Sequence, residues 1–85
     1  MKTYRVEIVR SADRHIQKLP KADKKRILET IDKLASNPRP FGCKELVGFK
    51  GIFRIRSGNY RIIYTVIDDI LLVTVLDVPN RRDAY

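Results

Sequence analysis

The segment between residues 51 and 67 constrains the fold of this chain more than any other. It holds two runs rich in β-branched and aromatic residues, 52–57 and 60–67, which are joined by Ser57-Gly58-Asn59. Runs of this composition favour strands, and a short polar break containing glycine is typical of a tight turn. The sequence therefore predicts a β-hairpin here.

The hairpin would gather arginines on one of its faces. Because side chains alternate along a strand, Arg54 and Arg56 should lie on one face, and Phe53 and Ile55 on the other. Arg61 follows on the next strand and should lie close to the arginines that precede the turn. Several guanidinium groups held on one face of a sheet are unsuited to a buried core and well suited to binding phosphate.

The N-terminal half predicts one strand and two helices. Residues 4–9 alternate between apolar and charged and indicate a half-buried strand. Ser11 is expected to cap a first helix that stops at Pro20, and a second helix should run from about Lys21 to Ser36. The apolar positions at helical spacing are Ala12, Ile16 and Leu19 in the first helix, and Ile27, Leu28, Ile31, Leu34 and Ala35 in the second.

The remaining segments complete a small α+β domain. We expect residues 41–51 to form a loop that Leu46, Val47 and Phe49 anchor to the core. Asp68-Asp69 should form a hairpin turn before the strand 70–76, which is apolar on both faces and therefore suits the centre of a sheet. Residues 1–85 are thus expected to form a single domain, ordered β-α-α-β-β-β, with a mostly antiparallel sheet and an N-terminal helical hairpin packed on one face.

The charge of the chain favours an anionic partner. Its 85 residues include 18 Lys and Arg but only 10 Asp and Glu, which gives a net charge of +8. Nucleic acid, an acidic protein or a membrane surface would suit this charge, although small basic proteins need not bind anything. Cys43 is the only cysteine, and charged residues interrupt the N-terminus, so we expect a cytoplasmic protein without a signal peptide, a membrane span or a disulfide.

Several kinds of chemistry are excluded by composition. With one histidine, His15, and one cysteine, Cys43, the chain lacks the usual metal ligands, and we expect no metal and no cofactor. It has no Ser-His-Asp arrangement, P-loop or dinucleotide-binding motif. The side chains left to converge are Arg54, Arg56, Arg61, Arg81 and Arg82, together with Tyr60, Tyr64 and Tyr85. They fit either a phosphate site or a solvated basic face whose tyrosines pack, and spacing alone does not decide between these.

Four motifs give the chain a resemblance to a known family. They are Glu45-Leu46-Val47-Gly48, Phe53-Arg54-Ile55-Arg56, Asn59-Tyr60-Arg61-Ile62-Ile63-Tyr64 and the ending Arg81-Arg82-Asp83-Ala84-Tyr85. In combination, and over nearly the whole chain, they resemble the RelE/ParE toxins of bacterial and archaeal toxin–antitoxin pairs. The likeness is closer to the RelE branch, whose members cleave mRNA in the ribosomal A site. The ParE branch shares the fold but poisons DNA gyrase.

The resemblance implies a metal-independent endoribonuclease, an mRNA interferase. In such toxins the substrate's own 2′-OH attacks the adjacent phosphate, leaving a 2′,3′-cyclic phosphate and a free 5′-OH. The matching positions imply that Arg54 lies near the nucleophile, that Arg61 clamps the phosphate and that Arg81 lies by the leaving group. They also imply that Tyr85 orients the nucleotide and that Arg56 and Arg82 support RNA binding.

Two departures from the family bear on the mechanism. Arg54 stands where relatives often have lysine, and a guanidinium holds its proton too tightly to be an easy general base. Asn80 stands where relatives often have histidine. Arg54 therefore suits a charge clamp, and whether it also acts as the general base stays open.

The resemblance also implies partners. They are a cognate RelB-like antitoxin in a heteromeric toxin–antitoxin complex, and the ribosome with its mRNA; no membrane is involved. Two other functions stay open at this point, a ParE-like inhibitor of DNA gyrase and a catalytically silent basic interaction domain.

Overall fold

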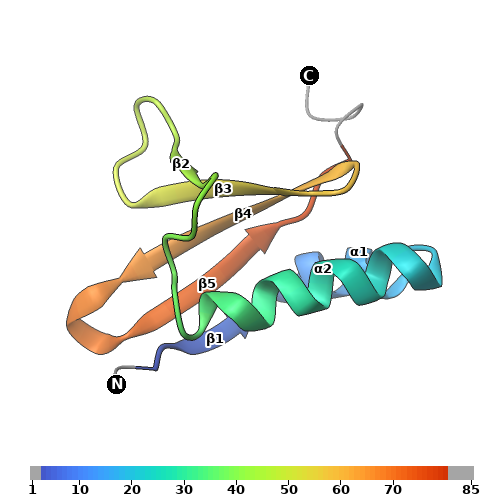
Figure 1. Cartoon of the computed structure of the whole chain (residues 1–85), viewed down its shortest axis with the longest axis horizontal. Helices are drawn as coiled ribbons and strands as arrows, with labels where there is room; N and C mark the ends of the chain where they lie inside the picture. The colour runs from blue at the N-terminus through green and yellow to red at the C-terminus, as the bar shows by residue number, and fades with distance from the viewer. Residues whose placement is uncertain (1–2, 81–85) are drawn as a thin grey trace.

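The computed structural model describes residues 3–80, which form a five-stranded sheet with two helices on one of its faces (Figure 1). The elements in chain order are β1 (Arg5–Ile8), α1 (Arg10–Gln17), α2 (Lys21–Leu34), β2 (Lys44–Glu45), β3 (Ile52–Ser57), β4 (Tyr60–Ile67), the short 3-10 helix η1 (Asp68–Ile70) and β5 (Leu72–Asp77). The strands lie in the order β1-β5-β4-β3-β2, and only β1 pairs in parallel, with β5. The predicted α+β class and its mostly antiparallel sheet are confirmed.

The predicted hairpin is present as β3 and β4. Ser57 pairs with Tyr60, so the turn consists of Gly58 and Asn59 alone. Gly58 has a φ of 61°. A positive φ at the first central position is what a type II′ turn requires, and this turn twists in the sense that joins two paired strands without splaying them.

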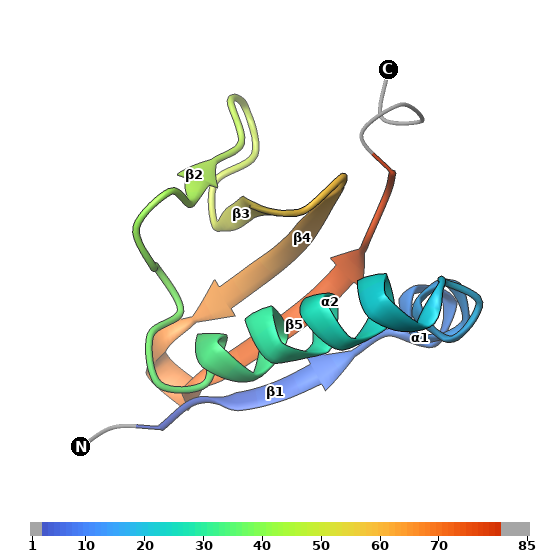
Figure 2. The same ribbon diagram turned by 45° about the vertical axis from the view of Figure 1, so that its right-hand side comes forward.

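The strand β5 lies between β1 and β4 and crosses the middle of the molecule (Figure 2). Val73 and Val75 are fully buried, and the helix α1 contacts this strand. The continuous apolar sequence of this segment therefore reflects its central place in the sheet, as predicted.

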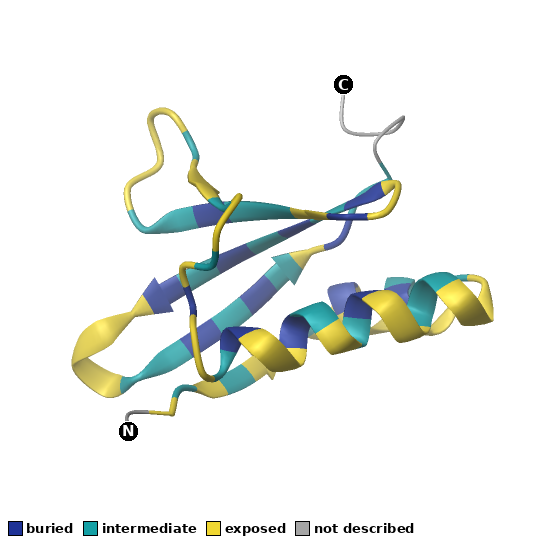
Figure 3. Ribbon diagram, in the orientation of Figure 1, coloured by how far each residue is buried: buried dark blue, intermediate teal, exposed yellow. Residues whose placement is uncertain are grey.

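The core lies between the helices and the sheet. The apolar residues of α1 and α2 point inward, and exposed residues cover the outer surface of α2 (Figure 3). The fully or nearly fully buried helix residues are Ala12, Ile16, Ile27, Ile31 and Leu34, and they pack against sheet residues that include Ile62, Tyr64, Val73 and Val75. The helical hairpin thus covers one face of the sheet and leaves the other open.

Ser11 is not the cap of the first helix. The helix α1 begins two residues earlier than that cap would place it, at Arg10, with Val9 in the capping position and no side-chain cap. Val9 is still bound to the sheet, because its N–H donates to the carbonyl of Val75 at 3.0 Å, while its own carbonyl accepts from Asp13 at 2.9 Å. The end of β1 therefore starts the helix directly, and Ser11 lies in the first turn.

The prediction of a plain loop over 41–51 was wrong in two respects. Lys44 and Glu45 form the short strand β2, which pairs with β3. Two residues are too few to give an alternating pattern that sequence could reveal. Val47 is 97% exposed and Phe49 is 59% exposed, so they do not anchor the segment to the core; hydrogen bonds within it hold its shape instead.

The strand expected at 70–76 begins two residues later than predicted. Asp68-Asp69 does form the turn, but the turn extends through Leu71, which has a φ of 50° and donates its N–H to the carbonyl of Asp68 at 3.2 Å. Ile70 is consequently exposed, although its composition suited a strand.

Candidate functional site

The part of the open sheet face that β2, β3 and β4 form carries four cationic side chains, Lys44, Arg54, Arg56 and Arg61. We call this surface the cationic face. Lys44 on β2 lies directly opposite Arg54 on β3, and Arg56 on β3 lies directly opposite Arg61 on β4. The structure therefore confirms that the three arginines of the hairpin share one face, and it adds a lysine that the sequence did not single out.

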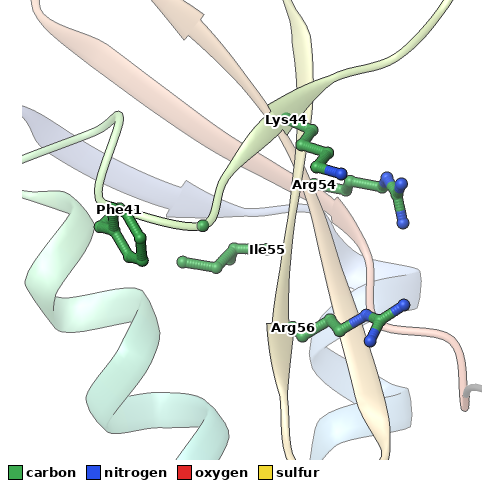
Figure 4. A pocket seen from close by; sticks show the side chains of 6 residues that line it. Phe41, Lys44, Arg54, Ile55 and Arg56 are labelled. Atoms are coloured by element: carbon green, nitrogen blue, oxygen red, sulfur yellow. The ribbon is translucent and has the colours of Figure 1, made fainter.

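The direction of these side chains follows from the pleat of β3. Lys44, Arg54 and Arg56 extend to the same side of the strands, whereas Phe41 and Ile55 lie on the other side (Figure 4). Phe53, which precedes Arg54, is buried in the core. Since neighbouring side chains on a strand point to opposite faces, burial of Phe53 turns Arg54 outward.

Two hollows border the cationic face. The first, of about 580 Å³, is lined by Lys44, Glu45, Leu46, Val47, Arg54, Arg61 and Ile63. The second, of about 400 Å³, is lined by Phe41, Gly42, Lys44, Arg54, Ile55 and Arg56. Both volumes fall within the range of small-molecule sites, roughly 300–1,000 Å³. Lys44 and Arg54 belong to both.

The cationic face differs from the rest of the surface in the placement of its charges, because like charges lie opposite each other across the strands. Ion pairs occur away from it, between Arg5 and Glu7, Arg26 and Asp23, and Arg39 and Asp68. Within residues 3–80, Lys44, Arg54 and Arg56 have no carboxylate partner. Other exposed cations, such as Lys25 and Lys50, have no carboxylate partner within residues 3–80 either. Like charges placed directly opposite each other across two strands are destabilising. An arrangement that repeats this in two adjacent pairs favours an anionic ligand.

Arg39 holds the orientation of Phe53 from the core side. Its guanidinium carbon lies 5.2 Å from the centre of the Phe53 ring, and that ring stacks on Tyr64 with centroids 5.9 Å apart. Arg39 also donates two hydrogen bonds to Asp68, of 3.1 and 2.8 Å. This ion pair joins the segment after α2 to the turn after β4.

Asp68 affects the titration of its neighbours. The hydroxyl of Tyr4 donates to Asp68 at 2.6 Å, and this hydrogen bond raises the pKa of Tyr4 above its ordinary value. The hydrogen bonds with Asp68 likewise raise the pKa of Arg39. The carboxylate is engaged in this exposed network, which agrees with its predicted role in a turn rather than in acid–base chemistry.

Tyr60 and Tyr64 are not part of the cationic face. Tyr60 is 8% exposed and Tyr64 is fully buried, so these two rings pack in the core and do not contribute to a phosphate site. The Tyr64 hydroxyl donates to the carbonyl of Pro38 at 2.8 Å, and burial raises the pKa of this hydroxyl well above its ordinary value.

The chain beyond β5 returns to the cationic face. The Arg61 N–H donates to the carbonyl of Pro79 at 3.0 Å, and Tyr60 forms a bridge with Asn80. The chain at residue 80 therefore lies beside the start of β4, next to Arg61. The predicted site residues Arg81, Arg82 and Tyr85 lie outside the described residues.

The remaining polar candidates do not form a site. No group of three or more metal-ligating side chains occurs among residues 3–80. His15 is half-buried in α1, and Cys43 is partly buried against the core. No helix in this part of the chain is long and apolar enough to cross a membrane.

The fold and the cationic face define a small, basic α+β protein with helices on one sheet face and arginines on the other. The chain belongs to the RelE/ParE family of toxins of type II toxin–antitoxin systems. The family model described as the ParE toxin of the type II toxin–antitoxin system parDE matches residues 6–85.

Individual relatives support this membership. A protein named as a RelE1 toxin from Methanocaldococcus jannaschii is 31% identical over 85 residues, covering 96% of this chain and 94% of its own. A chain of the archaeal RelE–RelB complex from Pyrococcus horikoshii has a TM-score of 0.85 at 36% identity, covering 96% of this chain and 99% of that chain. A chain of the RelBE2 toxin–antitoxin complex from Mycobacterium tuberculosis has a TM-score of 0.82 at 30% identity, covering 98% and 97%. The chains from Pyrococcus horikoshii and Mycobacterium tuberculosis were both crystallised in toxin–antitoxin complexes.

Proposed function

We propose that this chain is a metal-independent endoribonuclease that cleaves mRNA in the A site of the ribosome. The observation that carries the proposal is the cationic face, in which two pairs of like-charged side chains lie opposite each other and Lys44, Arg54 and Arg56 have no carboxylate partner within the described range. An RNA backbone supplies the anion that this arrangement lacks. The likeness to RelE toxins favours mRNA as the substrate.

In the proposed reaction, the 2′-oxygen of the substrate forms a bond to the adjacent phosphorus as its proton leaves. The bond from phosphorus to the 5′-oxygen then breaks, and that oxygen takes up a proton. The products are a 2′,3′-cyclic phosphate and a 5′-OH. The transition state carries extra negative charge on the phosphate oxygens, and positioned cations lower its energy most where water is excluded.

Arg54 and Arg61 are the residues we assign to that charge. They line the same hollow from adjacent strands, so both can approach one phosphate. Arg56 is assigned to RNA binding, because it lies opposite Arg61 and is exposed. From the family resemblance we assign Arg81 to the leaving oxygen, Tyr85 to the orientation of the nucleotide and Arg82 to RNA binding.

The proposed partners follow from the same surface. Relatives form complexes with RelB antitoxins, and we propose that a RelB-like antitoxin holds this toxin inactive in a heteromeric complex. The net charge of +8 would favour an antitoxin segment that is partly acidic and folds as it binds. The ribosome would align the message over the cationic face.

Primer extension on a reporter mRNA after brief expression of the toxin tests the proposal. Cuts within translated codons that disappear in an Arg54→Ala, Arg61→Ala double variant support it. The double variant must still bind the antitoxin, which shows that it has folded. Intact mRNA from a toxic wild type contradicts the proposal.

One alternative has its own support, since the matching family model is that of ParE toxins. A gyrase inhibitor acts by binding and does not require a cluster of phosphate clamps. It would leave the reporter mRNA intact and damage the chromosome, and inhibition of supercoiling by purified gyrase would identify it. A silent interaction domain would produce neither effect.

A further inference from the structure

Lys44 is the cation of the cationic face that neither the sequence motifs nor the proposed mechanism uses. It is exposed on β2, directly opposite Arg54, and the two side chains extend in the same direction (Figure 4). No carboxylate pairs with it among residues 3–80. A lysine ammonium is a compact charge with three donors, which suits a phosphate oxygen.

An apolar wall lies beside Lys44 in the hollow of about 580 Å³. It consists of Leu46 and Val47, which follow β2, and Ile63 on β4. Val47 is 97% exposed. Single exposed apolar residues are ordinary, but this one lines the same hollow as Arg54 and Arg61.

Hydrogen bonds hold this wall in place. The Leu46 N–H donates to the carbonyl of Ile52 at 2.8 Å, and the Phe49 N–H donates to the carbonyl of Leu46 at 3.1 Å. The carboxylate of Glu45 accepts from the Gly51 N–H at 2.8 Å. The Glu45 side chain is thus bound to the loop backbone, and Val47 lies in a turn that these hydrogen bonds stabilise.

We propose that this part of the hollow is a second nucleotide subsite, in which Lys44 binds a backbone phosphate of single-stranded RNA and Leu46 and Val47 receive the face of its base. The inference rests on the proposed function and extends it by one nucleotide. Cations that follow the backbone, combined with apolar surfaces for the bases, are the usual composition of single-strand sites. RNA fits better than an acidic peptide, since Lys44 lines the same hollow as Arg54 and Arg61, to which the proposed function assigns an RNA phosphate.

The test measures binding of a fluorescein-labelled RNA hexamer, 2′-O-methylated so that it is not cleaved, by fluorescence anisotropy between about 50 and 200 mM salt. Lys44→Ala should weaken binding about fivefold and reduce the slope of log affinity against log salt by about 0.7, the value for one single-strand phosphate contact. Lys44→Arg should restore both. Val47→Ser should weaken binding without changing the slope.

Lys25→Ala is the matched control, because Lys25 is exposed on α2, on the opposite side of the sheet. It should leave affinity and slope close to those of the wild type. Each variant is first checked for cooperative unfolding at a melting temperature no lower than that of the wild type, so that a loss of RNA affinity cannot be a loss of folding.

A second arm distinguishes the source of the phosphate. Lys44→Ala should reduce toxin binding to ribosomes that carry a message more than to ribosomes that carry none, if Lys44 binds mRNA. An equal reduction for ribosomes with and without a message would mean that Lys44 contacts ribosomal RNA. The subsite would then stand, with ribosomal RNA instead of mRNA as its ligand. Weaker antitoxin binding with unchanged RNA affinity would overturn the subsite and indicate a peptide instead.

Failure of this inference and failure of the proposed function look different. If wild type and Lys44→Ala bind the hexamer equally while the wild type still cleaves mRNA, only the subsite is wrong. If the wild type does not cleave mRNA but Lys44→Ala still weakens hexamer binding, the subsite stands and the nuclease assignment falls. A wild type that neither binds nor cleaves RNA overturns both.

Discussion

Reversing the charge of Lys44 should stabilise the fold while it weakens RNA binding. Lys44 and Arg54 are directly opposite each other on β2 and β3 and have no carboxylate partner within residues 3–80. Lys44→Glu replaces a repulsive cross-strand pair with an attractive one. Each change contributes about 0.2–1 kcal/mol, so the two together give about 0.4–2 kcal/mol.

Exposure of Lys44 reduces this figure. Water screens the pair, so we expect the lower half of the range, about 0.5–1 kcal/mol in the free energy of unfolding. For a domain of this size, about 1 kcal/mol shifts the melting temperature by roughly 4–8 °C, so the expected rise is about 2–8 °C. Lys44→Gln removes only the repulsion and should give about half of it.

Thermal unfolding followed by circular dichroism at low and high salt is the assay. The rise should shrink toward zero near 1 M salt, where the screening length is about 3 Å. Lys50→Glu is the control, since Lys50 is exposed in the loop before β3 and the variant has the same change in net charge. If Lys44→Glu is no more stable than Lys50→Glu, or if its gain is unaffected by salt, the cationic face is not self-repelling and the main argument for an anionic ligand fails.

Three further predictions concern single side chains. Arg61→Ala should lower the rate of mRNA cleavage about a hundredfold or more, the equivalent of roughly 3 kcal/mol in the barrier, with antitoxin affinity nearly unchanged. Single-turnover cleavage on ribosomes that carry a message measures this rate, and a change below threefold would contradict the assignment. Truncation of Tyr85 should weaken cleavage more than antitoxin binding, and full activity without it would remove its proposed role. Tyr64→Phe should cost about 1–2 kcal/mol in denaturant unfolding, because the variant leaves the carbonyl of Pro38 without its donor. The wild type should also lose stability in alkali, because the pKa of Tyr64 is raised in the folded state. The contribution of Tyr64 to the free energy of unfolding is complete below about pH 10 and is lost as the pH rises above that value. The loss should be smaller in Tyr64→Phe.

The sheet and its arginines could be predicted because they depend on local periodicity. The two-residue turn at Gly58 and Asn59 sets the register of β3 and β4, and the period of two then places Arg54, Arg56 and Arg61 on one face. The same reasoning found the helical stripes and the central strand. It failed for Ser11, since the helix starts where β1 leaves the sheet, a boundary that pairing with Val75 decides.

Lys44 and Val47 could not be assigned from sequence. Their segment has no period, and a strand of two residues exists only because β3 offers an unpaired edge. Because the segment has no period, Val47 was expected to contact the core, whereas its side chain is exposed to solvent. The motif Glu45-Leu46-Val47-Gly48 marked the right part of the chain, although only pairing across the strands revealed which of its neighbours face the arginines.

The sequence by itself determined the two helices, the four longer strands, their order and the face on which the hairpin arginines lie, because a turn and an alternating pattern act within a few residues. The tertiary structure alone decided that Lys44 completes the cationic face, that Tyr60 and Tyr64 belong to the core and that residue 80 returns beside Arg61. These relations join residues that are distant along the chain, and only the packing of the sheet against its helices brings them together.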